Sequence, residues 1–123
     1  MEKELQGRIG IVTGGSSGLG YAIANTLAEA GATVYVISRT GGEKKGLDPN
    51  REGVIHTIGD VTHFEEMRSL VNAIASREGL DFLVNNAGIT KKCRAEEFPM
   101  EDFERILNVN VTSIFALCQS AYP

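Results

Sequence analysis

A glycine-rich turn at residues 13–20 constrains the fold of this chain most strongly. It joins an apolar run at residues 9–12 to an amphipathic run at residues 21–30. This order predicts a strand, a tight turn and the start of a helix. The first N–H groups of a helix have no partner inside it, and the aligned peptide dipoles make that end positive. The turn therefore predicts a binding site for a phosphate group, and in particular a pyrophosphate.

Each glycine of the turn has its own expected role. Gly14 allows the tight turn, Gly18 lets a bulky anion approach the backbone, and Gly20 lets the helix pack closely on the sheet. Ser16 and Ser17 add hydroxyl donors. The spacing is Gly-x-x-x-Gly-x-Gly and differs from the commoner dinucleotide-binding motif Gly-x-Gly-x-x-Gly. The turn therefore matches that motif in its phosphate-binding mechanism and not letter for letter. Taken alone, the same residues also fit a plain flexible loop.

Composition limits the class of protein. The chain has 123 residues, of which 42% are hydrophobic, which suits one modest globular domain. A net charge of −4 with interspersed signs gives no reason to expect nucleic-acid or membrane binding, and we expect a cytoplasmic location. Cys93 and Cys118 are too few and too far apart to indicate a metal cluster or a disulfide framework. We therefore expect no metal site.

The apolar runs predict an α/β protein. Four short β-branched runs without alternation indicate strands buried on both faces of a parallel sheet: residues 9–12, 34–37, 54–58 and 82–84. Helical spacing follows at residues 19–30 and 63–78, with Thr62 as a possible N-cap of the second helix. Residues 40–53 indicate a surface loop with at most a short helix.

A long helix is predicted over residues 99–122. It is apolar around so much of its circumference that we expect burial on two sides, with one stripe at Phe103, Ile106, Leu107, Asn110, Ile114, Leu117 and Ala121 and a second at Val111, Phe115 and Cys118. Asn110 lies within the first stripe. A buried amide needs hydrogen-bond partners or costs about 1–3 kcal/mol, so its simplest role is a core asparagine that ties helix to strand.

Four motifs in order carry a family resemblance. They are Thr13-Gly14-x-x-x-Gly18-x-Gly20, Asp60-Val61 after the third run, Asn85-Asn86-Ala87-Gly88 after the fourth, and Asn110 in the following helix. Together they resemble the short-chain dehydrogenase/reductase family over essentially the whole chain. The resemblance implies a Rossmann-type doubly wound parallel sheet, with strand order 3-2-1-4 within this chain. Residues 1–123 would then form the dinucleotide-binding half of a single domain.

The resemblance also implies roles for particular residues. Asp60 and Val61 would contact the adenine. Asp60 could instead serve simply as the cap of the next helix. Both roles could also coexist, with Thr62 as the capping residue. Ile89 would pack on the nicotinamide side. Asn110 would belong to the catalytic set and hold a water for a proton relay. The other implied cofactor contacts are Gly14, Ser16, Ser17, Gly18, Leu19 and Gly20 at the pyrophosphate, and Asn86, Ala87 and Gly88 at the ribose.

Cofactor choice can be argued from the end of the second strand. A fold that selects NAD usually places an acidic residue there for the ribose 2′-hydroxyl. This chain has Ser38-Arg39-Thr40, and no acid follows until Glu43. Arg39 offers a planar, permanently charged fork to a 2′-phosphate, and Ser38 adds a hydroxyl. We therefore expect NADP(H) in preference to NAD(H).

The family's catalytic Tyr-x-x-x-Lys pair does not occur in this sequence. Neither Tyr21 nor Tyr35 has a lysine four residues later, and Tyr122 is the penultimate residue. We therefore expect the N-terminal half of an enzyme, inactive by itself because the Tyr/Lys half is absent. Apolar faces meant for that half would be exposed, and we expect a homo-oligomer.

The predicted function is that of an NADP(H)-dependent oxidoreductase, interconverting a ketone and a secondary alcohol of a small molecule by hydride transfer. The alternative is a non-catalytic dinucleotide-binding or regulatory module. Basic residues at 91–94 would favour an acidic substrate such as a sugar acid or a carrier-linked acyl chain, and the motif wording resembles family members of those two kinds. The same residues also fit a solvated loop balanced by Glu96 and Glu97.

Overall fold

One parallel sheet organises the chain, whose computed structural model describes residues 3–14, 18–39, 52–89 and 92–122. Its strands are β1 (Ile9–Thr13), β2 (Thr33–Ser38), β3 (Val54–Ile58) and β4 (Phe82–Val84). Their order is β3-β2-β1-β4, and every neighbouring pair is parallel. The predicted α/β class and strand order are confirmed.

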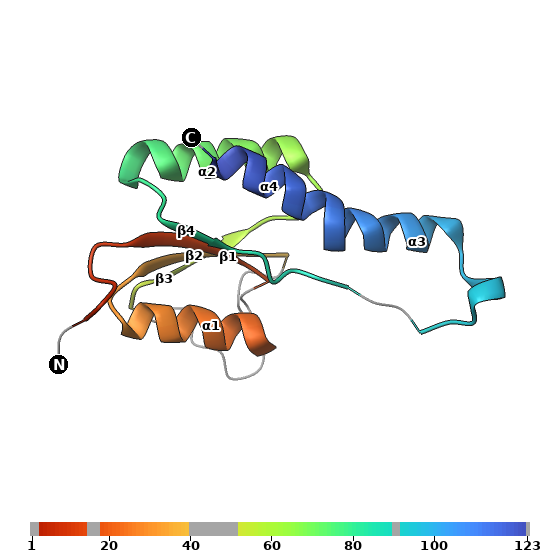
Figure 1. Cartoon of the computed structure of the whole chain (residues 1–123), viewed down its shortest axis with the longest axis horizontal. Coiled ribbons are helices and arrows are strands. Elements are labelled where there is room, and N and C mark those ends of the chain that lie inside the picture. Colours follow the sequence, from red (N-terminus) through yellow and green to blue (C-terminus); the bar gives the residue numbers. More distant parts are fainter. Residues whose placement is uncertain (1–2, 15–17, 40–51, 90–91, 123) are drawn as a thin grey trace.

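Helices cover both faces of the sheet (Figure 1). Helix α1 (Gly18–Glu29) lies on one face, while α2 (Phe64–Glu78) and α4 (Ser113–Ala121) lie side by side on the other. Helix α3 (Met100–Leu107) leads into α4 through a π-helical segment, η2 (Asn108–Thr112), and a short 3-10 turn, η1 (Ala95–Glu97), precedes it. A sheet covered on both faces is the doubly wound arrangement that the sequence predicted.

Two hydrophobic cores follow from these layers. The strands alternate their side chains between faces, so Ile11 and Ile37 enter one core while Val12 and Val36 enter the other. The first core joins the sheet to α2 and the long helix through Met67, Val71, Ile74, Val109 and Leu117. The second uses small residues of α1, Ala24 and Ala28, which let that helix approach the valines closely.

The long helix corrects one expectation. It is buried along one side only, at Val109, Ser113 and Leu117, because α2 and the sheet cover that side. The predicted second stripe is exposed, as is part of the first. Four exposed apolar residues follow one another at intervals of four along this helix, and we call them the exposed stripe: Phe103 (51%), Leu107 (42%), Val111 (58%) and Phe115 (68%).

Two further expectations concern loops. Thr62 does not cap α2: the cap position belongs to His63, and the Thr62 hydroxyl donates to Asp60 instead. Of the loop expected at residues 40–53, residues 40–51 lie outside the described part of the chain.

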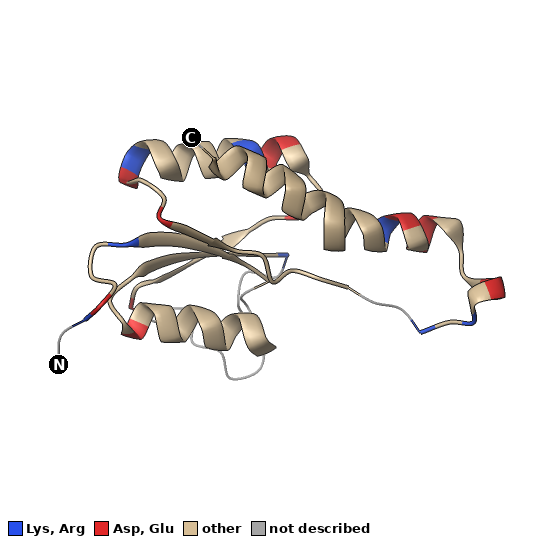
Figure 2. Ribbon diagram, in the orientation of Figure 1, with Lys and Arg blue, Asp and Glu red and all other residues tan. Residues whose placement is uncertain are grey.

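The charged residues of the described chain lie on the helices and loops (Figure 2). None of the four strands contains Lys, Arg, Asp or Glu, so the sheet interior is uncharged. Among the described helices, none is long and apolar enough to cross a membrane.

A polar contact ties the sheet to the end of α2. Tyr35 of β2 is buried, and its hydroxyl donates a hydrogen bond to the carboxylate of Glu78. This bond raises the pKa of Tyr35 above its ordinary value, burial and the negative charge of Glu78 add to the rise, and the positive charge of Arg77 opposes it.

We predict that stability falls as the pH rises above about 10, because the unfolded tyrosine loses its proton before the folded one does. Tyr35→Phe should lower the free energy of unfolding by about 1 kcal/mol at neutral pH and reduce this alkaline loss. Urea unfolding at about pH 7 and about pH 11 measures both effects. Tyr122→Phe is the control, since Tyr122 is 82% exposed. Identical pH profiles for Tyr35→Phe and the unaltered chain would contradict the assignment.

Candidate functional site

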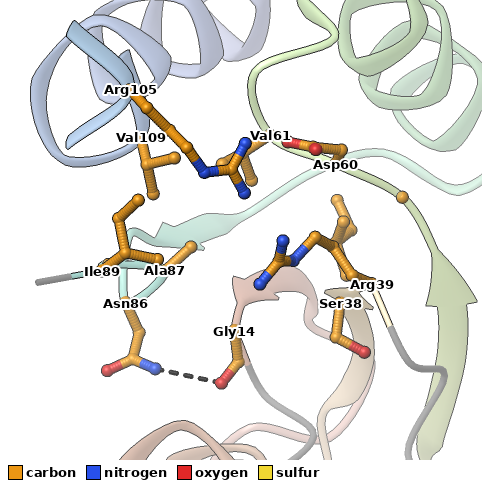
Figure 3. A pocket seen from close by; sticks show the side chains of 13 residues that line it. Gly14, Ser38, Arg39, Asp60, Val61, Asn86, Ala87, Ile89, Arg105 and Val109 are labelled. Atoms are coloured by element: carbon orange, nitrogen blue, oxygen red, sulfur yellow. Dashed lines mark hydrogen bonds between the residues drawn. The ribbon is translucent and has the colours of Figure 1, made fainter. Parts of the chain in front are cut away.

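The carboxyl ends of all four strands meet at one edge of the sheet and line a cleft of about 360 Å³ (Figure 3). In an open α/β sheet this is the edge at which ligands bind. The cleft is lined by Gly14, Ile37, Ser38, Arg39, Gly59, Asp60, Val61, Asn86, Ala87, Gly88, Ile89, Arg105 and Val109. Nine of the residues proposed from the sequence are among them.

Thr13 joins the two central loops of the cleft. It is 1% exposed at the end of β1, and its hydroxyl oxygen accepts hydrogen bonds from the backbone N–H groups of Asn86 and Ala87, both at 3.0 Å. The same hydroxyl lies 3.5 Å from the carbonyl oxygen of Val84, to which it can donate. One side chain therefore fixes the segment after β4 against the end of β1.

The glycine turn is packed against that same segment. The Asn86 side chain donates to the Gly14 carbonyl at 3.1 Å (Figure 3). A Cβ on Gly20 would lie 2.3 Å from the Gly14 oxygen and 2.5 Å from the Asn86 side-chain nitrogen. No side chain fits there, so Gly20 permits the close packing that the sequence predicted.

No described residue crowds the start of α1. Gly18 begins the helix with a φ of +55°, and a Cβ there would meet no atom of the described residues within 4 Å. Leu19 is 70% exposed. Among described residues, Gly18, Leu19 and Gly20 do not line the cleft itself, and Ser16 and Ser17 lie outside the described residues. The helix terminus is thus open to an anion from its side of the cleft.

Ser38 and Arg39 follow directly at the end of β2. Ser38 is buried, whereas Arg39 is exposed and directs its guanidinium group into the cleft (Figure 3). Thr40 and Glu43 lie outside the described residues. The end of β2 therefore presents a cation at the edge of the sheet where ligands bind.

Asp60 keeps an ionised carboxylate at the end of β3. One carboxylate oxygen accepts from the Thr62 backbone N–H at 2.9 Å and from the Thr62 hydroxyl at 2.7 Å. Burial is the largest influence and would raise the pKa, but the hydrogen bonds from Thr62 and nearby positive charges outweigh it, so the pKa of Asp60 lies below its ordinary value. Its second oxygen has no hydrogen bond within the described residues. The carboxylate can therefore accept from a ligand N–H.

Asn110 holds the segment after Gly88 against the long helix. Its side-chain oxygen accepts from the Ile89 backbone N–H at 2.9 Å, and its side-chain nitrogen donates to the Ile89 carbonyl at 2.8 Å. Asn110 lies in the π-helical segment η2, a feature often found at functional sites. The amide is satisfied as the sequence analysis required, and its partner is the backbone that leads out of β4.

Four cleft residues were missed from the sequence, and two of them, Ile37 and Gly59, lie beside proposed residues at the ends of β2 and β3. Arg105 and Val109 both come from the long helix and line the cleft. Their spacing of four residues places them on one face of a helix, one turn apart, which is the signal that could have found them. Thr13 was read only as part of the glycine motif, and nothing in its spacing showed that it bonds to the segment after β4.

The positive charge of the basic segment, expected at residues 91–94, is exposed in its described part and partly balanced by a nearby acidic residue. Lys92, Cys93 and Arg94 are exposed, and Arg94 lies 3.9 Å from the carboxylate of Glu96. Lys91 lies outside the described residues. No group of described residues could hold a metal ion.

The donor set fits an adenine dinucleotide better than a simple anion. An open helix terminus, a guanidinium and a carboxylate follow β1, β2 and β3 in turn. In an adenine dinucleotide a pyrophosphate, a ribose and a base with an exocyclic amine follow one another in the same order.

Comparisons with known proteins agree with this geometry. A family profile described as short chain dehydrogenase matches residues 8–123. The chain is 35% identical to 3-oxoacyl-[acyl-carrier-protein] reductase FabG of Aquifex aeolicus, covering 98% of this chain and 51% of that protein. It is 38% identical to 2-dehydro-3-deoxy-D-gluconate 5-dehydrogenase of Bacillus subtilis, covering 95% and 47%.

A solved structure shows the same fold. A short chain dehydrogenase from Burkholderia cenocepacia in complex with NADP matches with a TM-score of 0.83 and 33% identity, covering 95% of this chain and 50% of that one. The chain thus spans about half the length of the relatives it matches.

We predict that Thr13→Val lowers the free energy of unfolding by about 2–4 kcal/mol, because the N–H groups of Asn86 and Ala87 lose their acceptor. Thr13→Ser keeps the hydroxyl and should lose much less. Chemical denaturation of both variants measures the difference. Equal stability of the two would show that the hydroxyl does not hold the loops together.

Proposed function

We propose that this chain, which belongs to the short chain dehydrogenase family, forms the cofactor-binding half of an NADP(H)-dependent oxidoreductase. The enzyme would interconvert a ketone and a secondary alcohol by hydride transfer. The observation that carries the proposal is the carboxyl edge of the sheet, where the start of α1, beside the cleft, and Arg39 and Asp60, within it, follow β1, β2 and β3 in turn.

The strand order sets how the cofactor would lie. The pyrophosphate belongs at the start of α1, after β1, and the adenosine ribose at the end of β2. The base then lies toward β3, at Asp60 and Val61, and the nicotinamide half toward β4, at residues 86–89. When bound, the nicotinamide ring supplies the hydride chemistry, and the protein orients it.

Arg39 supports the choice of NADP(H). Its guanidinium enters the cleft at the position where NAD-selecting folds carry an acid. A planar cation can bind a 2′-phosphate through two parallel hydrogen bonds. The solved relative that holds NADP is consistent with this choice.

Asn110 would serve the reaction in two ways. Its amide holds Ile89, and with it the face on which we place the nicotinamide. We also assign it the water-holding role of the family's catalytic asparagine. Because none of the chain's tyrosines has a lysine four residues later, we expect this chain by itself to bind cofactor without turnover. Turnover by the isolated chain would contradict that expectation.

The substrate is proposed only as a small carbonyl or alcohol. The two relatives named above act, by their names, on a carrier-linked oxoacyl group and on a sugar acid. The sugar acid is acidic, and the oxoacyl group is carried on a separate group. Exposed Lys92 and Arg94 lie in the segment beyond residues 86–89, where we place the nicotinamide. The cytoplasmic location expected from the sequence remains part of this proposal.

We further propose that the chain forms homo-oligomers through apolar faces such as the exposed stripe. Large side chains gather there at Phe103, Leu107, Val111 and Phe115. Sedimentation should find dimers or larger species, and Phe115→Lys should shift them toward monomer. A monomeric, cooperatively melting unaltered chain would contradict the proposal.

We predict that Arg39→Asp lowers the preference for NADP⁺ over NAD⁺ by about ten- to a hundredfold, because a charge-assisted contact is replaced by repulsion of the 2′-phosphate. Isothermal titration with both dinucleotides gives the ratio. Arg77→Asp is the control for net charge, since Arg77 lies in the last turn of α2. An unchanged preference in Arg39→Asp would make the assignment of NADP(H) wrong.

A further inference from the structure

Arg105 brings a second cation to the cleft, from an element that contributes none of the sequence motifs assigned to the cofactor. It lies on α3 one helical turn before Val109, and both residues line the cleft. In Figure 3 the side chain of Arg105 extends from the long helix into the cavity, and Arg39 extends into it from the end of β2.

The positive charge of Arg105 acts on the Asp60 carboxylate, at the end of the cleft where we place the adenine base. It is one of the positive charges that lower the pKa of Asp60, so it lies within electrostatic reach of that carboxylate. Within the described residues Arg105 has no ion pair and no hydrogen bond that would hold it elsewhere. A cation on the cleft wall that has no partner among the described residues is available to a ligand.

The order of the strands places the adenine beside this cation. The ribose lies at β2 and the base at β3, and Arg105 faces the latter from the helix side. A guanidinium plane can stack on an aromatic base and attract it through cation–π interaction. Asp60 meanwhile can accept from the exocyclic amine at the edge of the same ring.

We propose that Arg105 is a nucleotide-positioning residue that covers one face of the adenine ring, while Asp60 accepts from the exocyclic amine at its edge. The inference rests on the proposed dinucleotide site and adds a division of labour between the two arginines. Arg39 discriminates the 2′-phosphate, whereas Arg105 holds the base and so acts equally on phosphorylated and unphosphorylated nucleotides.

Calorimetric titration of the full chain with 2′,5′-ADP, 5′-ADP and nicotinamide mononucleotide tests this division. Arg105→Gln should weaken both adenine nucleotides by about fivefold and leave their ratio unchanged. Arg39→Gln should instead reduce the preference for 2′,5′-ADP. Binding of nicotinamide mononucleotide should not respond to Arg105→Gln. Glu104→Gln is the matched control, because it changes one charge at the adjacent exposed residue of the same helix.

The outcomes separate this inference from the proposed function. If the unaltered chain binds 5′-ADP and Arg105→Gln binds it equally well, Arg105 does not hold the base and only this inference fails. A change in the ratio of the two adenine nucleotides in Arg105→Gln would also overturn it, since the residue would then act on the phosphate. If the unaltered chain binds no adenine nucleotide, the proposed function itself fails.

Discussion

The hydrogen bonds accepted by the Thr13 hydroxyl hold this site together. They join the end of β1 to the segment after β4, which supplies one wall of the cleft. Asn86, fixed in this way, bonds to Gly14, and the start of α1 packs against both because Gly20 has no side chain. The open terminus of α1 therefore has a fixed position relative to the strand ends. A binding site formed from backbone N–H groups depends on such fixed positions, since no flexible side chain can correct an error.

Charge is arranged across the cleft in a way that suits a nucleotide. The strands beneath are uncharged, and the charges that matter stand at the strand ends and on the long helix. Arg39 and Arg105 approach from two sides, and Asp60 stays ionised because Thr62 and neighbouring positive charges outweigh the effect of burial. Asn110 adds a positional constraint by fixing the backbone of Ile89. Binding is thus favoured by several groups that are already in place before a ligand arrives.

Sequence reasoning predicted the layers well and the tertiary contacts less well. Continuous β-branched runs and glycine stops are local signals, so the strands and the helices could be predicted, whereas the strand order followed from the family resemblance. The contacts of Thr13 and Arg105 cross between distant elements, and their local patterns resemble an ordinary strand end and an ordinary helix surface. The second stripe of the long helix was wrongly expected to be buried, because apolar periodicity shows which face could be covered and does not show what covers it. Thr62 is of a residue type that commonly caps helices, yet its hydroxyl donates to the Asp60 carboxylate and does not cap α2.

The central claim is that the strand ends and the start of α1 bind one adenine dinucleotide. Following backbone amide NMR signals during titration with NADP⁺ tests it most directly. We predict the largest shifts at Gly18 and Gly20, at Val61, and at residues 86–89, with little change at Val111 and Phe115 of the exposed stripe. Shifts that concentrate on the exposed stripe, or an absence of shifts at millimolar NADP⁺, would contradict the account.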